Sequence, residues 1–297
     1  MKFLCKIFAL SIISSMVPLL QPLTAQSYSN ADLAAVEKGA SCPGGDLSGA
    51  DLSSYNLSGR DFAGTDFTEA RLDGTNLDKA QLHNAVFRNA ILHRSRLRDA
   101  DLTDADLSYV QAADADFTNA KMDRAQLFRS QLPGSKLLNV SLQYAQIQEA
   151  VLDNIQGDYA DFSHASLPYS WLRSASLPNA CFYGANMYST HMAKADLTHA
   201  DLRSAKLGHS DLQQAKLSRA LLDRAVLEYA DLRGAELEYT QFGTAFKDHA
   251  KFRRVPMEES LAIHDIPEPC QIWTGIWMSL GRGVQLLART SFGRSNR

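Results

Sequence analysis

A single spacing dominates this sequence: a large apolar residue recurs at every fifth position from Leu47 to Phe252. This register holds 42 positions, of which 39 are Leu, Phe, Met or Ile, and only Ala112, Gly157 and Lys247 depart from it. The residue two places earlier is usually very small, and 27 of these 42 residues are alanine. A period of five fits neither the 3.6-residue period of an amphipathic helix nor the alternation of a half-buried strand.

Repetition at a fixed short period is typical of a solenoid, in which each unit buries its apolar residues only against its neighbours. A square coil accounts for the pattern if each group of five forms one side, with the large residue and the alanine pointing inward. The repeats, such as Ala100-Asp101-Leu102-Thr103-Asp104, resemble those of the pentapeptide-repeat family over about 207 of 297 residues, without an insertion. The resemblance implies an all-β fold, a right-handed four-sided β-helix with twenty residues in each coil.

Charged residues give an independent test of the twenty-residue coil, because residues i and i+20 would lie above one another at ~4.8 Å. Within residues 46–252, 14 pairs at this separation carry opposite charges and 3 carry like charges, whereas a separation of fifteen gives 8 of each. The arginine-rich stretch 86–98 is therefore expected to be a self-neutralised face rather than a nucleic-acid patch. The expected pairs include Arg94–Asp114, Arg96–Asp116, Asp78–Arg98, Asp104–Arg124, Asp101–Lys121 and Asp196–Lys216–Glu236.

Residues 1–25 have the form of a cleavable secretory signal. Lys2 and Lys6 precede an apolar run over residues 7–20, and a small-residue cleavage site ends at Ala25. The run is short and contains Pro18, which disfavours a lasting transmembrane helix, although an uncleaved anchor stays the alternative. We therefore expect an exported protein, located in the periplasm or in a compartment like the thylakoid lumen.

Residues 26–45 are predicted to form a short helix and a cap ahead of the repeat. Ser29 with Asp32 three residues later is a capping-box-like start, and the helix is expected over residues 29–40. Such a helix would cover the open end of the first coil, which otherwise exposes strand groups and leucines. The entry segment 41–50 resembles that of exported cyanobacterial members of the family, many of which carry a second cysteine where Gly45 stands here.

The four cysteines are Cys5, Cys42, Cys181 and Cys270, and their spacing matches no zinc site. Cys181 falls at an outward position of the repeat. Cys42 and Cys270 flank opposite ends of the solenoid, which about ten coils would separate by roughly 50 Å. A bond between these two is therefore not expected unless the tail folds back along the whole length.

Departures from the repeat concentrate in residues 155–192, where outward aromatic residues gather. Stacking at twenty residues per coil should bring several of them to one corner over three successive coils, as a candidate partner-binding surface. The alternative is that these rings merely stack along strand columns. The predicted partner-binding residues are Tyr169, Trp171, Tyr188, His191 and His209.

Residues 253–297 leave the repeat as a linker followed by an amphipathic, basic segment. Its apolar residues recur at helical spacing, and no acidic residue follows Glu268. Three roles stay open: a cap over the last coil, a membrane-surface helix, or a tail that binds a partner. The residues expected to make the cap or membrane contact are Trp273, Trp277, Leu280, Val284 and Leu287.

No catalytic, cofactor-binding or metal-binding pattern is found in the sequence, so no enzyme activity and no cofactor are expected. The formal net charge of −3 excludes a strong overall field for nucleic acid, and the repeat carries 27 acidic and 21 basic residues. We expect a non-enzymatic scaffold for an unknown protein partner, with a homodimer left open. Because some members of the family mimic DNA and bind gyrase, the resemblance also implies that alternative for a cytoplasmic protein.

Overall fold

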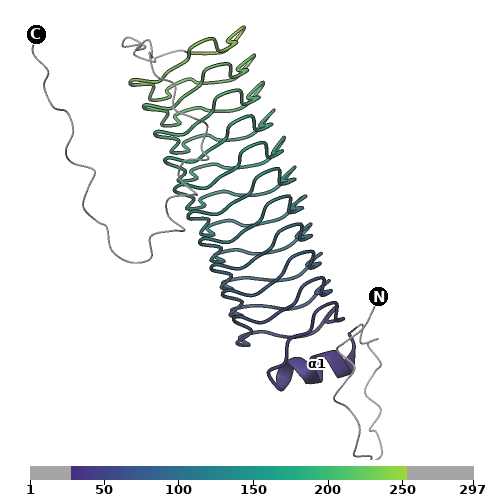
Figure 1. Ribbon diagram of the computed structural model, residues 1–297. Coiled ribbons are helices and arrows are strands. Elements are labelled where there is room, and N and C mark those ends of the chain that lie inside the picture. Colours follow the sequence, from purple (N-terminus) through teal and green to yellow (C-terminus); the bar gives the residue numbers. More distant parts are fainter. Residues whose placement is uncertain (1–27, 253–297) are drawn as a thin grey trace, which may run out of the picture.

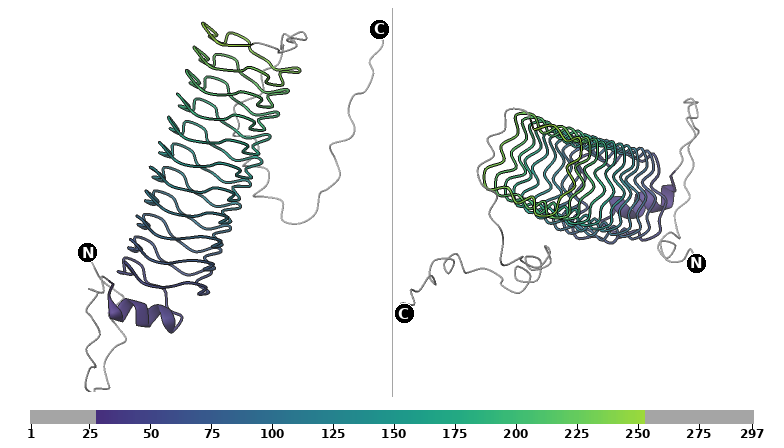
Figure 2. Two further views of the ribbon diagram at one scale, coloured as in Figure 1. Left: turned by 180° about the vertical axis from the view of Figure 1, so that it is seen from behind. Right: turned by 90° about the horizontal axis from the view of Figure 1, so that it is seen from above.

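The computed structural model describes residues 28–252, which form one long stack of coils with the helix α1 (Asn30–Glu37) at its N-terminal end (Figures 1 and 2). No extended strand is present among these residues. Isolated parallel bridges occur instead, one on each side of every coil, from Asp46↔Asp66 to Asp231↔Lys251. Each bridge joins residues that are twenty apart, and successive bridges are five apart. This arrangement confirms the predicted four-sided β-helix with twenty residues per coil.

A β-turn closes every side of the coil. The N–H of Ala50 donates to the carbonyl of Leu47 at 3.1 Å, and Gly49 between them has φ of 69°. Positive φ at the second central residue defines a type II turn. The same turn recurs at intervals of five, as at Tyr229, whose φ is 59°. Many of these positions hold residues other than glycine, although the left-handed region is unfavourable for a bulky side chain.

Between coils, the backbone forms a regular ladder of hydrogen bonds. The N–H of Leu47 donates to the carbonyl of Asp66 at 2.8 Å, and the N–H of Asp66 donates back to Gly45 at 2.9 Å. This pattern repeats along the stack, so each coil supplies the partners that the neighbouring coil requires. The backbone is consequently a rigid support for the side chains that project outward.

The interior is filled by the two residues of each side that the sequence predicts to face inward. Leucines and alanines at these positions are buried except in the last coil, where Ala245 and Ala250 are partly exposed, and phenylalanines stack on one another between coils. The rings of Phe67 and Phe87, for example, lie 4.8 Å apart at an interplanar angle of 7°. At the last coil, the register residue Lys247 is exposed, and its Nζ lies 4.8 Å from the ring centroid of Phe242.

Helix α1 covers the first coil, as the sequence predicts. The Oγ of Ser29 accepts from the N–H of Asp32 at 3.3 Å, and Asp32 Oδ2 accepts from the N–H of Asp46 at 2.9 Å. Val36 is buried against the coil, and Arg60 donates to its carbonyl at 2.9 Å. Gly45 is required here, because an added Cβ would lie 2.2 Å from the sulfur of Cys42.

The predicted signal peptide at residues 1–25 and the predicted amphipathic segment at residues 253–297 lie outside the described residues. Both therefore stay predictions. Within residues 28–252, no helix is long and apolar enough to cross a bilayer.

Candidate functional site

A continuous column of aromatic rings runs along one edge of the C-terminal half of the stack. Four successive ring contacts form this aromatic column, with centroid separations of 6.0, 5.3, 4.9 and 4.7 Å. The last two contacts are face to face, at 17° and 13°. The tyrosines of the column are 40–54% exposed. Its members are Tyr169, Tyr188, His209, Tyr229 and His249.

Three of the five predicted partner-binding residues, Tyr169, Tyr188 and His209, lie in this column. The other two, Trp171 and His191, contact each other at 5.7 Å beside it, two positions along the chain from Tyr169. All five thus gather along the same edge, as the twenty-residue coil requires. Sequence reasoning missed Tyr229 and His249, although both follow from His209 by steps of twenty residues.

Aromatic stacking also occurs elsewhere on the surface. Tyr144 stacks on His164 at 5.0 Å, and His164 contacts Tyr183 at 5.5 Å. A separate pair, Tyr109 and Phe128, lies 5.5 Å apart. These sets contain two or three rings, whereas the aromatic column contains five. Substitutions in these smaller sets can therefore serve as controls: they remove ring stacking without touching the aromatic column.

About half of the basic residues outside the column, 11 of 21 in residues 46–252, form ion pairs with carboxylates. Three predicted pairs are present, with N–O distances of 2.6 Å for Arg98–Asp78, 2.7 Å for Arg124–Asp104 and 3.7 Å for Lys216–Asp196. Burial alone would raise the pKa of Asp78, but hydrogen bonds from Arg98 and Arg96 outweigh it and hold the pKa below its ordinary value.

Other predicted pairs are wrong in detail. Arg96 bonds Asp78 instead of Asp116, since outward positions on the neighbouring coil eighteen residues away are also within reach. No ion pair of Arg94 is found within residues 28–252. Asp101 accepts from the N–H of Thr103 at 3.1 Å rather than pairing with Lys121.

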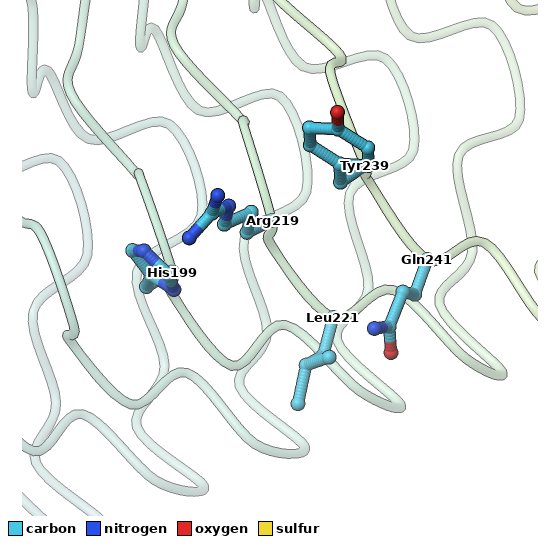
Figure 3. A pocket seen from close by; sticks show the side chains of 5 residues that line it. All are labelled: His199, Arg219, Leu221, Tyr239 and Gln241. Atoms are coloured by element: carbon cyan, nitrogen blue, oxygen red, sulfur yellow. The ribbon is translucent and has the colours of Figure 1, made fainter. Parts of the chain in front are cut away.

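A hollow of about 500 Å³ lies near the C-terminal end of the stack (Figure 3). His199, Arg219 and Tyr239 project into it from three successive coils, and Leu221 and Gln241 complete its lining. The guanidinium of Arg219 lies 5.6 Å from the ring centroid of Tyr239. Among the described residues, Arg219 forms no ion pair with a carboxylate. Sequence reasoning missed this hollow, although its charged and aromatic residues also recur at steps of twenty.

Within residues 28–252, no group of three histidine, cysteine or acidic residues could hold a metal ion. One carboxyl is electrostatically unusual. Burial, together with the neighbouring Asp196, raises the pKa of Asp158. The predicted tail contacts, from Trp273 to Leu287, lie outside the described residues.

Comparison with known sequences supports the assignment of the repeat. The family described as pentapeptide repeats matches in 8 copies, at residues 46–84, 80–119, 95–134, 158–192, 180–219 and 205–238. These ranges include more than half of the chain. The chain belongs to the pentapeptide-repeat family. No match is found among curated proteins.

Similar solved structures include other pentapeptide-repeat proteins. HetL from the cyanobacterium Nostoc sp. strain PCC 7120, involved in heterocyst differentiation regulation, is 25% identical over 76% of this chain and 97% of its own, with a TM-score of 0.47. QnrB1, a plasmid-mediated fluoroquinolone resistance protein, is 16% identical over 62% and 92%, with a TM-score of 0.49. A thylakoid-lumen protein of Arabidopsis thaliana is 32% identical over 33% and 66%, with a TM-score of 0.18. The family assignment depends on the repeat match and the coil geometry.

Proposed function

We propose that this pentapeptide-repeat protein is an exported, non-catalytic scaffold that holds a protein partner against its aromatic column. The observation that carries the proposal is the unbroken line of five exposed rings from Tyr169 to His249. Tyrosine anchors are enriched at binding hot spots, and they lose little side-chain entropy when they bind. Here the rings are also held in place by one another and by a rigid backbone.

The backbone under the column has the positive-φ turn that recurs along the solenoid. Tyr169, His209, Tyr229 and His249 have φ between 57° and 61°, a region in which glycine or asparagine is far more comfortable. Other turns of the same solenoid do use glycine there, as at Gly49 and Gly134. Aromatic residues at four such positions carry a backbone cost that glycine would avoid, as non-glycine residues do at many other turns of the solenoid.

The alternative of DNA mimicry has less support. A DNA mimic presents rows of carboxylates to a DNA-binding protein, whereas arginines bind Asp78, Asp104 and Asp153 directly on this surface. Export would also separate the protein from a cytoplasmic gyrase. Membrane contact through the basic tail is a further alternative, and it concerns residues outside 28–252.

The decisive experiment compares two matched tyrosines. Tyr229 and Tyr144 both occupy the positive-φ turn position, both are about half exposed, and both stack on histidine. The full-length protein with a photo-crosslinker at Lys206, close to the column, should capture a partner in the native envelope fraction. Tyr229→Asn should abolish this capture, whereas Tyr144→Asn should leave it intact. Equal capture by the two variants would show that the column is not the binding surface.

Export is tested separately. A fusion of residues 1–40 to a reporter that is active only outside the cytoplasm should give signal, and the mature protein should begin near Gln26. Intact Met1 on soluble cytoplasmic protein would contradict export and would revive the gyrase alternative.

A further inference from the structure

Arg219 stands at a corner of the solenoid without the carboxylate partner that equivalent arginines have. Arg124 and Arg129 occupy the same positive-φ turn position on other corners, and each binds a carboxylate twenty residues away at 2.7 Å. The residues twenty before and twenty after Arg219 are His199 and Tyr239, neither of which is an acid. Within the described part of the chain, no side chain forms an ion pair with Arg219. Its guanidinium therefore has the position of half an ion pair whose anion the solenoid does not supply.

Tyr239 holds this guanidinium by its flat face. The carbon at the centre of the group lies over the tyrosine ring, 5.6 Å from the ring centroid. Figure 3 shows Arg219 between His199 and Tyr239, which come from the neighbouring coils. Stacking on a ring uses the face of a guanidinium and leaves its N–H edge available. Two parallel N–H groups on that edge match the two oxygens of a carboxylate.

The amide of Gln241 offers a second polar contact to a ligand. Its Oε1 is buried and accepts no hydrogen bond from the residues that the structure describes. A buried acceptor without a donor is unfavourable. The last torsion of a glutamine side chain is soft, and turning the amide toward the hollow breaks no hydrogen bond of this oxygen. A ligand N–H could therefore satisfy Gln241.

Leu221 makes part of the lining apolar. It occupies an outward position of the ladder, where it bridges to Gln241 on the next coil, and it is only partly buried. A ligand that contacts both Arg219 and Gln241 therefore also meets this leucine and the ring of Tyr239. The hollow of about 500 Å³ has the size of an ordinary small-ligand site.

We propose that this hollow binds an organic carboxylate that carries an amide N–H and an apolar side chain. The C-terminal residue of a peptide and an N-acylated amino acid share this chemistry. The carboxylate binds Arg219, the N–H donates to Oε1 of Gln241, and the apolar group packs on Leu221 and Tyr239. Arg219 is the one permanently charged side chain among the five that line the hollow, so a monoanion matches it better than a phosphate dianion.

The hollow is separate from the aromatic column. Arg219 and Tyr229 are ten residues apart, which is half of a twenty-residue coil, so they lie at opposite corners of the solenoid. Binding in the hollow depends neither on a partner at the column nor on export. Each proposal can therefore fail without the other.

Calorimetric titration of the full-length protein with N-acetyl-L-phenylalanine tests the site. The wild type should bind this acid, and should bind the uncharged N-acetyl-L-phenylalaninamide at least about tenfold more weakly. Arg219→Gln should lower the affinity for the acid by at least about tenfold. Arg94→Gln is the matched control and should leave the affinity unchanged. Arg94 also occupies a positive-φ turn and has no ion pair among the described residues, but it lies about six coils, or roughly 30 Å, from Arg219.

Several outcomes would overturn the proposal. These are equal affinity of the wild type and Arg219→Gln for the acid, equal affinity of the wild type for the acid and its amide, and no binding of the acid at roughly 10 mM. Tighter binding of inorganic phosphate than of the acid would also overturn it.

A second variant keeps the test valid if Arg219→Gln does not fold. Arg219→Lys keeps the positive charge but loses the planar fork, so it should bind the acid more weakly than the wild type. Wild-type affinity in Arg219→Lys would overturn the proposed pairing with the guanidinium edge. A five-residue peptide that ends in phenylalanine distinguishes the two sources of the ligand. Tighter binding of the peptide than of the acylated amino acid would support a peptide C-terminus, and equal binding would support recognition of the terminal residue alone.

Discussion

Ile155 and Gly157 exchange the side-chain sizes that the repeat assigns to their positions. The larger residue stands where alanine is usual, and glycine stands where leucine is usual; both face the interior. Leu177 of the next coil leans into the space above Gly157, so that an added Cβ would lie 2.8 Å from its Cδ2. Val110 and Ala112 make the same exchange. On these two sides, a larger and a smaller inward residue change places, so that the side still fills its share of the interior.

This relationship predicts a coupled pair of substitutions. Gly157→Leu should destabilise by about 1–3 kcal/mol through overpacking against Leu177, and Ile155→Ala by about 2–5 kcal/mol through a cavity. The double variant restores the regular repeat. Its loss of unfolding free energy should therefore be smaller than the sum of the two single losses, by roughly 1 kcal/mol or more. Denaturant unfolding of the four proteins measures this coupling. If the loss in the double variant equals the sum of the two single losses, the side chains at 155 and 157 do not compensate for one another.

The sequence was sufficient to predict the coil, the inward residues and the N-terminal helix, because each depends on period and local chemistry. The twenty-residue period also predicted that Tyr169, Tyr188 and His209, which follow one another by 19 and 21 residues, lie along one edge. Which carboxylate an arginine binds could not be predicted. A flexible arginine reaches partners twenty, eighteen or two residues away, as Arg98, Arg96 and Arg203 do respectively. The hollow at Arg219 could not be predicted either, because the sequence does not show that this arginine lacks a carboxylate partner among the described residues.

Asp78 is expected to be the most costly surface carboxylate to neutralise. It binds both Arg96 and Arg98, and its side chain is only 12% exposed. Asp78→Asn should cost about 1.5–3 kcal/mol, whereas Asp104→Asn, at a more exposed pair, should cost about 0.2–1 kcal/mol. Because the folded pKa of Asp78 is lowered, its contribution is present above pH ~4 and is lost as pH falls through the folded pKa. The difference between wild type and Asp78→Asn should therefore shrink at about pH 3 and below. A difference that is constant with pH would contradict the ion-pair assignment.

Asp158 should behave in the opposite way. Burial and Asp196 raise its pKa, so the folded state binds its proton more tightly than the unfolded state. The ionised carboxylate then destabilises the fold at neutral pH, and this penalty disappears as pH falls below its unfolded value near ~4. Asp158→Asn should raise the melting temperature at pH 7 and leave it nearly unchanged at pH 3. Asp153→Asn, which removes the partner of Arg173, is the control and should lower it at pH 7. A fall in melting temperature for Asp158→Asn at pH 7 would mean that the carboxylate has a stabilising partner.

The tail offers a test of the predicted end cap over the last coil. In the last coil, the ring centroids of Phe242 and Phe252 lie 6.0 Å apart. The Nζ of Lys247 lies over the ring of Phe242. If residues 255–297 cap this coil, truncation after Arg254 should lower the melting temperature and promote aggregation through the open strand edge. If truncation leaves the melting temperature unchanged, the cap is wrong. Loss of co-sedimentation with anionic vesicles in the truncated protein would then favour the membrane alternative, since basic residues near such a surface contribute roughly 1 kcal/mol each.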